Sequence, residues 1–126
     1  MISIPRPNTG SKNCEFFSKL FEARDVSHKQ HLQTTSYAEH KALNDFYEEV
    51  LPLIDEIVEG YQGLYGLQKI DMVFNITNSL PIDYFTSLYK YIEENRHIFK
   101  ESWIQNEIDN ISKLVAKTLY KLKHLK

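Results

Sequence analysis

The sequence predicts an all-α protein built as a bundle of four helices, and three observations lead to this. Apolar residues recur at alternating steps of four and three in separate stretches of the chain, which is the period of a helix packed in a bundle. Four glycines and four prolines among 126 residues argue against a loop-rich or disordered chain. A single long stretch, from Gly60 to about Leu80, loses the pattern, and it is long enough to cross the length of a bundle.

The chain is expected to begin with an extended tail, residues 1–10, followed by a single domain, residues 11–126. Ser11 is a natural N-cap for a first helix that runs to about Leu32. The face of this helix is apolar in its first half and polar in its second half, which indicates a polar interface or a site near its end. The apolar half comprises Phe16, Phe17, Leu20 and Phe21, and the polar half Arg24, Ser27, His28 and His31.

The second helix is predicted from Ser36 to Gly60. Ser36 is followed three residues later by Glu39, which is the pattern of a capping box. Pro52 lies inside the helix and is expected to bend it without ending it. The apolar stripe comprises Leu43, Tyr47, Val50, Ile54, Ile57 and Tyr61.

Two further helices follow the long connection. Ser79 and Pro81 open the third helix, and a brief turn at residues 100–102 leads to the fourth. The third stripe is Ile82, Phe85, Tyr89, Ile92, Arg96 and Phe99, and the fourth is Ile104, Ile108, Ile111, Val115, Thr118, Leu122 and Leu125. Short, long and short connections give two antiparallel hairpins, which is the ferritin-like arrangement of a four-helix bundle.

Composition limits the classes of function. The net charge of −2 provides no overall attraction to nucleic acid. One cysteine, Cys14, excludes an intrachain disulfide and suits a reducing compartment. The first residues do not have the pattern of a signal peptide, and no window approaches the roughly 18 apolar residues of a membrane span. We therefore expect a soluble cytoplasmic protein without a membrane partner.

A histidine and two carboxylates of the second helix have the spacing of a metal site shared between two chains. Asp55 and Glu59 are four residues apart and lie on one helix face. His40 lies about 22 Å from Asp55 on a straight helix, so one chain cannot bring them together. A two-fold axis near Tyr47 would place His40 of one chain beside both carboxylates of the other. That dimer face follows His40 around the helix through Leu51, Asn44, Asp55, Glu48 and Glu59.

The same residues resemble a known family, the Dps/ferritin-like superfamily and most closely its small phage and bacterial members. The pattern is His31-Leu32-x-Thr34-x-Ser36-Tyr37-Ala38-x-His40-Lys41-Ala42-Leu43, followed by Asp55-x-x-x-Glu59. The resemblance implies a ferroxidase centre between two subunits, with His31 and His40 from one and Asp55 and Glu59 from the other. The usual spacing between the histidines would select His28, which is kept as the reserve ligand. Asn44 stands where Dps-type proteins commonly carry an aspartate, and it is kept as the second reserve ligand.

The function implied by the resemblance is iron storage or oxidative protection in the cytoplasm of a bacterial or phage-infected cell. Fe(II) would be bound by the four ligands and oxidised by dioxygen or peroxide to a ferric mineral, with other divalent metals as alternatives. The implied assembly is a homo-oligomer, at least a two-fold dimer and at most a dodecameric shell. Without the resemblance, the two histidines and two acids could instead form hydrogen bonds at a polar dimer seam.

Two other classes of function stay open. One is a metal-free ferritin-like helical interaction protein, such as a phage accessory factor, which predicts an obligate dimer without iron. The other is a DNA-associating protein that works through a basic C-terminus, which predicts that salt weakens binding and that removal of the residues after Leu119 abolishes it. The candidate DNA contacts are Lys117, Lys121, Lys123 and Lys126, preceded by Lys113.

Overall fold

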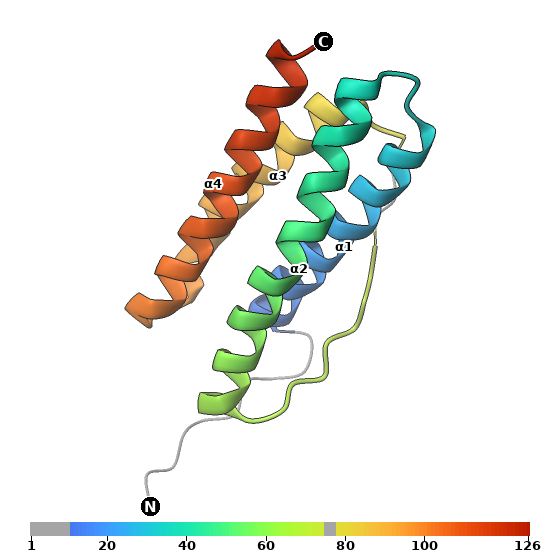
Figure 1. Ribbon diagram of the computed structural model, residues 1–126. Helices are drawn as coiled ribbons and strands as arrows, with labels where there is room; N and C mark the ends of the chain where they lie inside the picture. Colours follow the sequence, from blue (N-terminus) through green and yellow to red (C-terminus); the bar gives the residue numbers. More distant parts are fainter. Residues whose placement is uncertain (1–10, 75–77) are drawn as a thin grey trace, which may run out of the picture.

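The computed structural model describes residues 11–74 and 78–126, so the predicted tail, residues 1–10, lies outside the described residues. The helices are α1 (Lys12–Gln33), α2 (Tyr37–Tyr65), α3 (Pro81–Asn95) and α4 (Ser102–His124), with a 3-10 turn, η1 (Arg96–Ile98), between the last two. The described part of the chain contains no strand. The predicted all-α bundle of four helices is therefore confirmed (Figure 1).

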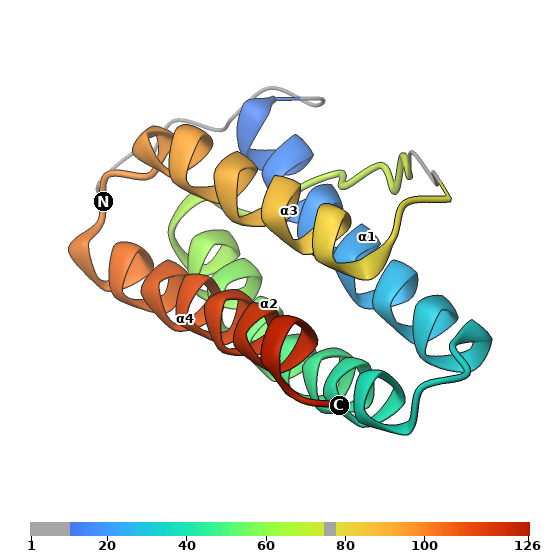
Figure 2. The ribbon, with the colours of Figure 1, turned by 90° about the horizontal axis from the view of Figure 1, so that it is seen from above.

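The helices form two antiparallel hairpins that pack side by side (Figure 2). α1 packs against α2 and α3, and α4 packs against α2 and α3, so the pairs α1 with α4 and α2 with α3 lie on the diagonals. The connection between Tyr65 and Pro81 brings the chain back to the opposite end of the bundle, and α2 and α3 consequently run in the same direction (Figure 1). This is the predicted topology with one long crossover.

The helix starts follow the capping residues. The Ser11 hydroxyl accepts a hydrogen bond from the backbone N–H of Cys14, and the Ser36 hydroxyl accepts one from Glu39, which satisfies N–H groups that have no partner within their helices. α3 starts with Pro81, whose missing N–H costs nothing at that position. α2 continues through Pro52 to Tyr65, five residues beyond the predicted end.

The core is made by the inward stripes of all four helices. Phe16 and Phe17 of α1, Phe46 of α2 and Phe85 of α3 are fully buried, and such aromatic side chains contribute the most apolar area. The predicted stripes of α2 and α4 are largely confirmed. Their fully or almost fully buried members include Leu43, Val50, Ile54, Ile57, Ile104, Ile108, Ile111 and Val115.

The predicted stripe of α3 is partly wrong. Ile82 and Tyr89 are exposed at 37% and 40%, whereas Tyr84 and Leu88, which lie outside the predicted stripe, are buried. The buried residues Tyr84, Phe85, Leu88 and Ile92 form one stripe that is rotated around the helix from the predicted stripe. The rotation brings Tyr84 against Glu22 of α1, while α3 also packs against α4. In the described residues, no helix is long and apolar enough to cross a membrane.

Candidate functional site

The two histidines predicted as metal ligands meet at the connection between α1 and α2. The Nδ1 atom of His31 lies 2.8 Å from the backbone oxygen of His40, and the Nδ1 atom of His40 lies 2.8 Å from the backbone oxygen of His31. Because a carbonyl oxygen can only accept, both Nδ1 atoms carry the hydrogen. The rings stack with centroids 3.7 Å apart and planes 23° apart. Each histidine thus fastens the end of one helix to the start of the other.

His28 and Asn44, the two reserve ligands, belong to the same polar cluster. The ring of His28 stacks on Tyr47 with centroids 4.4 Å apart, and the Tyr47 hydroxyl donates a hydrogen bond to the Asn44 side-chain oxygen at 2.9 Å. Tyr47 was predicted as a core residue, but it is only half-buried because it covers this cluster. The end of α1 is therefore a polar interface with α2, as the change from apolar to polar residues along the face of α1 indicated.

The two predicted carboxylates do not join the histidines within the chain. Asp55 and Glu59 are exposed farther along α2, and among residues 11–74 and 78–126 no three His, Cys, Asp or Glu side chains lie close enough to hold a metal ion. Imidazole lone pairs lie in the ring plane, so the stacked rings of His31 and His40 do not direct both Nε2 atoms at one ion. A site shared between two chains stays a prediction.

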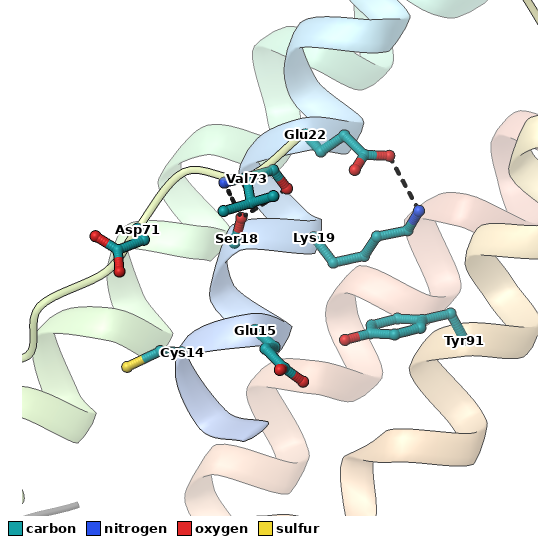
Figure 3. Close-up of a pocket in the computed structure, with 8 residues that line it drawn as sticks. All are labelled: Cys14, Glu15, Ser18, Lys19, Glu22, Asp71, Val73 and Tyr91. Carbon is teal, nitrogen blue, oxygen red and sulfur yellow. Dashed lines mark hydrogen bonds and ion pairs between the residues drawn. The ribbon is translucent and has the colours of Figure 1, made fainter. Parts of the chain in front are cut away.

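A pocket of about 350 Å³ lies over the outer side of α1, between the crossover and α3 (Figure 3). Its main feature is Glu22, a residue that is 3% exposed and whose carboxylate accepts hydrogen bonds from Lys19 Nζ and the Tyr84 hydroxyl, both at 3.0 Å. Lys19 Nζ also lies over the rings of Tyr84 and Tyr91, 5.4 and 5.7 Å from their centroids, a cation–π arrangement. Burial and the Glu22 carboxylate raise the pKa of Tyr84 well above its usual range.

The side chain of Ser18 attaches the crossover to this region. The Ser18 hydroxyl accepts a hydrogen bond from the backbone N–H of Val73 at 3.1 Å and donates to the Val73 oxygen at 3.4 Å. Cys14, Ser18 and Glu22 follow one another at four-residue steps and are all buried, because the crossover and α3 cover them. The Lys19, Glu22 and Tyr84 cluster was missed by sequence reasoning, since Glu22 and Tyr84 are 62 positions apart.

A groove between α3 and α4 exposes aromatic side chains. This α3–α4 groove has a volume of about 310 Å³ and is lined by Tyr89, Ala116, Leu119, Tyr120, Lys123 and His124. Tyr89 and Tyr120 are exposed at 40% and 59%, and the Tyr120 and His124 rings lie 5.5 Å apart. The groove therefore combines apolar side chains and two tyrosines with Lys123 and His124 at one end.

The α2 side of α4 carries two further grooves. One has about 490 Å³ near the C-terminal end of α4 and is lined by Tyr37, Ala38, Lys41, Ala42, Asp45, Lys121, His124, Leu125 and Lys126. The other has about 270 Å³ farther along the helices and is lined by Glu49, Leu53, Asn110, Lys113, Leu114 and Lys117. We refer to the surface that contains both grooves as the α2–α4 face.

The candidate DNA-contacting lysines do not form one surface. Lys121 Nζ lies 3.5 Å from a carboxylate oxygen of Asp45, which also pairs with Lys41 at 3.0 Å. Burial acts to raise the pKa of Asp45, but the hydrogen bonds and charges of Lys41 and Lys121 outweigh it and lower that pKa. Lys117 lies in the α2–α4 face, whereas Lys123 lines the α3–α4 groove. Two sides of α4 share the basic charge.

Comparison with known proteins identifies a family and a relative. The model of DUF5856, a family of unknown function, matches residues 31–122. Over 114 residues the chain is 32% identical to an uncharacterized 14.6 kDa protein in the mobD-ri intergenic region of Enterobacteria phage T4, with 89% of this chain and 88% of that protein covered. No solved structure matches the chain.

These matches show that the resemblance to the Dps/ferritin-like superfamily is wrong, because the family that matches is a different one. The physical reason is that the pattern describes a helical hairpin rather than a ferroxidase. His31 and His40 lie on either side of a short turn and donate hydrogen bonds to each other's backbone oxygens. Asp55 and Glu59 lie four apart on an exposed helix face, which is common on solvated helices. Neither feature requires iron.

Proposed function

The chain belongs to DUF5856, a family of unknown function, and we propose that it is a helical interaction protein that binds a partner protein at the α3–α4 groove. The relative in phage T4 supports a role as a phage accessory factor in an infected bacterial cell. The observation that carries the proposal is the exposure of Tyr89 and Tyr120 across an open groove floored by Ala116 and Leu119.

The residue types of the groove are those of a protein-binding surface. Tyrosine is enriched among the side chains that dominate protein–protein affinity, because its ring buries a large area with little loss of rotamer freedom. Ala116 lines the groove with both tyrosines, and its small side chain leaves room for a side chain of the partner. Lys123 and His124 lie at one end of the groove. The occupant that fits is an amphipathic helical segment with apolar anchors and carboxylates.

A nucleic acid fits this surface less well. Neutralisation of phosphates requires several cations along one surface, whereas Lys121 is paired with Asp45 and Lys117 and Lys123 face different neighbours. The α2 helix beside α4 carries seven acidic residues and one lysine, which would repel a phosphate backbone. We therefore do not propose DNA binding, and the experiment below distinguishes it from binding of a partner protein.

The proposal is tested by NMR titration of the isotope-labelled protein with a designed amphipathic helical peptide of Leu, Phe and Glu. We expect shifts of backbone amides near Tyr89, Ala116 and Tyr120, and weaker binding of the same peptide with Lys in place of Glu. Tyr120→Ala should weaken binding about tenfold or more. Leu67→Ala is the control, because Leu67 is an exposed apolar side chain of the crossover.

Three results would overturn the proposal. The first is the absence of shifts around the α3–α4 groove at saturating peptide. The second is an equal effect of Tyr120→Ala and Leu67→Ala on the affinity. The third is a response to a short DNA duplex alone, lost when the residues after Leu119 are removed, which would favour the DNA-associating class instead.

A further inference from the structure

The α2–α4 face carries charges of opposite sign in two separate rows. Glu49 and Glu56 are seven residues apart on α2 and lie on one helix face, and Lys113 and Lys117 are four apart on α4. We call these the acidic row and the lysine row. Glu49, Lys113 and Lys117 line the same groove of about 270 Å³, so the two rows lie at the same level of the bundle. All four side chains are exposed.

The two rows do not neutralise each other within the chain. Asp45 and Lys121, one turn farther along, do form an ion pair at 3.5 Å. In contrast, none of Glu49, Glu56, Lys113 and Lys117 forms an ion pair with another residue in the part of the chain that the structure describes. The face thus presents opposite charges that are free to pair with a surface of the inverse pattern.

We propose that this surface is the same face of a second copy of the chain. A two-fold interface brings identical patches together, so it is favourable when each patch is complementary to itself. With the two-fold axis parallel to the helices and between α2 and α4, α2 of each copy faces α4 of the other. Glu49 of one copy is then level with Lys113 and Lys117 of the second copy. An axis perpendicular to the helices would instead set acid against acid.

Apolar residues at one end of the face complete the interface. Tyr37 of α2 and Leu125, after the end of α4, are exposed at 79% and 49% and line the groove of about 490 Å³ with Ala38 and Ala42. The same axis places Tyr37 of one copy level with Leu125 of the second copy. Apolar burial there supplies attraction that does not depend on salt, while the charge rows supply orientation and a salt-dependent part.

This arrangement differs from the dimer predicted on the other flank of α2. That flank runs from His40 through Asn44 and Leu51 to Glu48 and Glu59. His40, Asn44 and Leu51 are already half-buried, because that side of α2 faces α1. The α2–α4 face lies farther around the helix, on the side of α2 next to α4, and it shares only His124 with the lining of the α3–α4 groove.

The test is sedimentation velocity over a range of protein and salt concentrations. The wild type should form a dimer at low salt that dissociates as salt is raised. Two charge-reversed variants, Glu49→Lys with Glu56→Lys and Lys113→Glu with Lys117→Glu, should each raise the dissociation constant at least about tenfold. An equimolar mixture should restore a dimer, because each variant supplies the charges that the other requires. Circular dichroism verifies that both variants fold.

A matched control lies on the same helix. Glu48→Lys with Glu59→Lys makes the same change in net charge on the other flank of α2, and the dimer should persist in this variant. The proposal is wrong if the wild type stays monomeric, if the two reversed variants still dimerise alone, or if their mixture stays monomeric. It is also wrong if the control variant dissociates instead, which would identify the other flank as the interface. None of these outcomes depends on the α3–α4 groove.

Discussion

His31 and His40 donate hydrogen bonds from their Nδ1 atoms to each other's backbone oxygens, both at 2.8 Å. The carbonyl of His31 is one of the last four of α1, which have no partner within the helix. The side chain of His40 therefore completes the C-terminal end of α1 from the neighbouring helix. Two side chains from a short turn thus fix how the α1–α2 hairpin closes.

Replacement of His40 should loosen this hairpin. His40→Ala removes its hydrogen bond to the His31 carbonyl and the ring stacking, so we expect a loss of about 1–2 kcal/mol in the free energy of unfolding. The measurement is urea unfolding followed by circular dichroism. His97→Ala is the control, because His97 is an exposed histidine of η1, and it should change stability by less than about 0.5 kcal/mol. Equal losses in the two variants would show that the paired hydrogen bonds contribute nothing.

The hydrogen bond from Tyr84 to Glu22 should stabilise the bundle from the opposite side of α1. Tyr84→Phe leaves a buried carboxylate with one donor fewer, and a hydrogen bond to a charged group contributes about 1.5–3 kcal/mol. Tyr91→Phe is the matched control, since Tyr91 also lies on α3 and lines the pocket with Glu22, but its hydroxyl forms no hydrogen bond with another described residue. The two free energies of unfolding should differ by most of that amount, and a difference near zero would contradict the prediction.

Tyr61 should make the fold sensitive to alkaline pH. Burial, with smaller contributions from the neighbouring Tyr65, Cys14 and Glu101, raises the pKa of Tyr61 to about 12. An unfolded tyrosine ionises near pH 10, so the stabilisation from a neutral Tyr61 is complete below about pH 10 and is lost as the pH rises toward 12. Because Tyr61→Phe has no proton to lose, its free energy of unfolding should fall less over that range.

Urea unfolding at several pH values, beside the ultraviolet absorbance of tyrosinate, measures this effect. Tyr120→Phe is the control, since Tyr120 is exposed and its removal should leave the pH dependence of the wild type unchanged. An identical alkaline loss in the wild type and Tyr61→Phe would assign the pH dependence to other groups.

Features that depend on residues close together in the sequence could be predicted, whereas features that depend on contacts between helices could not. The helices follow from apolar periodicity and from Ser11, Ser36 and Pro81 at their starts, because caps act within one turn. The buried face of α3 does not follow, since it depends on which neighbours α3 contacts. Ile82 and Tyr89 fit a four-three stripe as well as Tyr84 and Leu88 do.

Of the candidate site, only the part that lies within the α1–α2 hairpin could be predicted from the sequence. His31 and His40 flank a short turn, so their proximity follows from the sequence. Their exchange of hydrogen bonds does not, because it depends on the rotamers that the turn allows. The α3–α4 groove depends on Tyr89 and Tyr120, which are 31 positions apart, and the Lys19, Glu22 and Tyr84 cluster depends on Glu22 and Tyr84, which are 62 positions apart. Neither could be found from spacing along one helix.

The packing of α2 on α4 should depend on a glycine beside the single tryptophan. A β-carbon added to Gly60 would lie 2.6 Å from the Trp103 ring, whereas one added to Gly63 meets no atom within 4 Å. Alanine is about 1 kcal/mol better than glycine inside a helix, so Gly63→Ala should stabilise the protein by about 0.5–1 kcal/mol. Gly60→Ala has the same gain in helix propensity, but its β-carbon must displace the Trp103 ring. We therefore expect it to be less stable than Gly63→Ala by at least about 1 kcal/mol.

Fluorescence distinguishes the cause, because Trp103 is the only tryptophan of the chain. Gly60→Ala should shift the emission toward that of a solvent-exposed ring, and Gly63→Ala should leave the emission unchanged. Equal stabilisation by the two alanines, with unchanged emission in both, would mean that Trp103 does not pack against Gly60. A shift without a difference in stability would mean that the ring moves at no cost and that the close approach of α2 and α4 does not need the glycine.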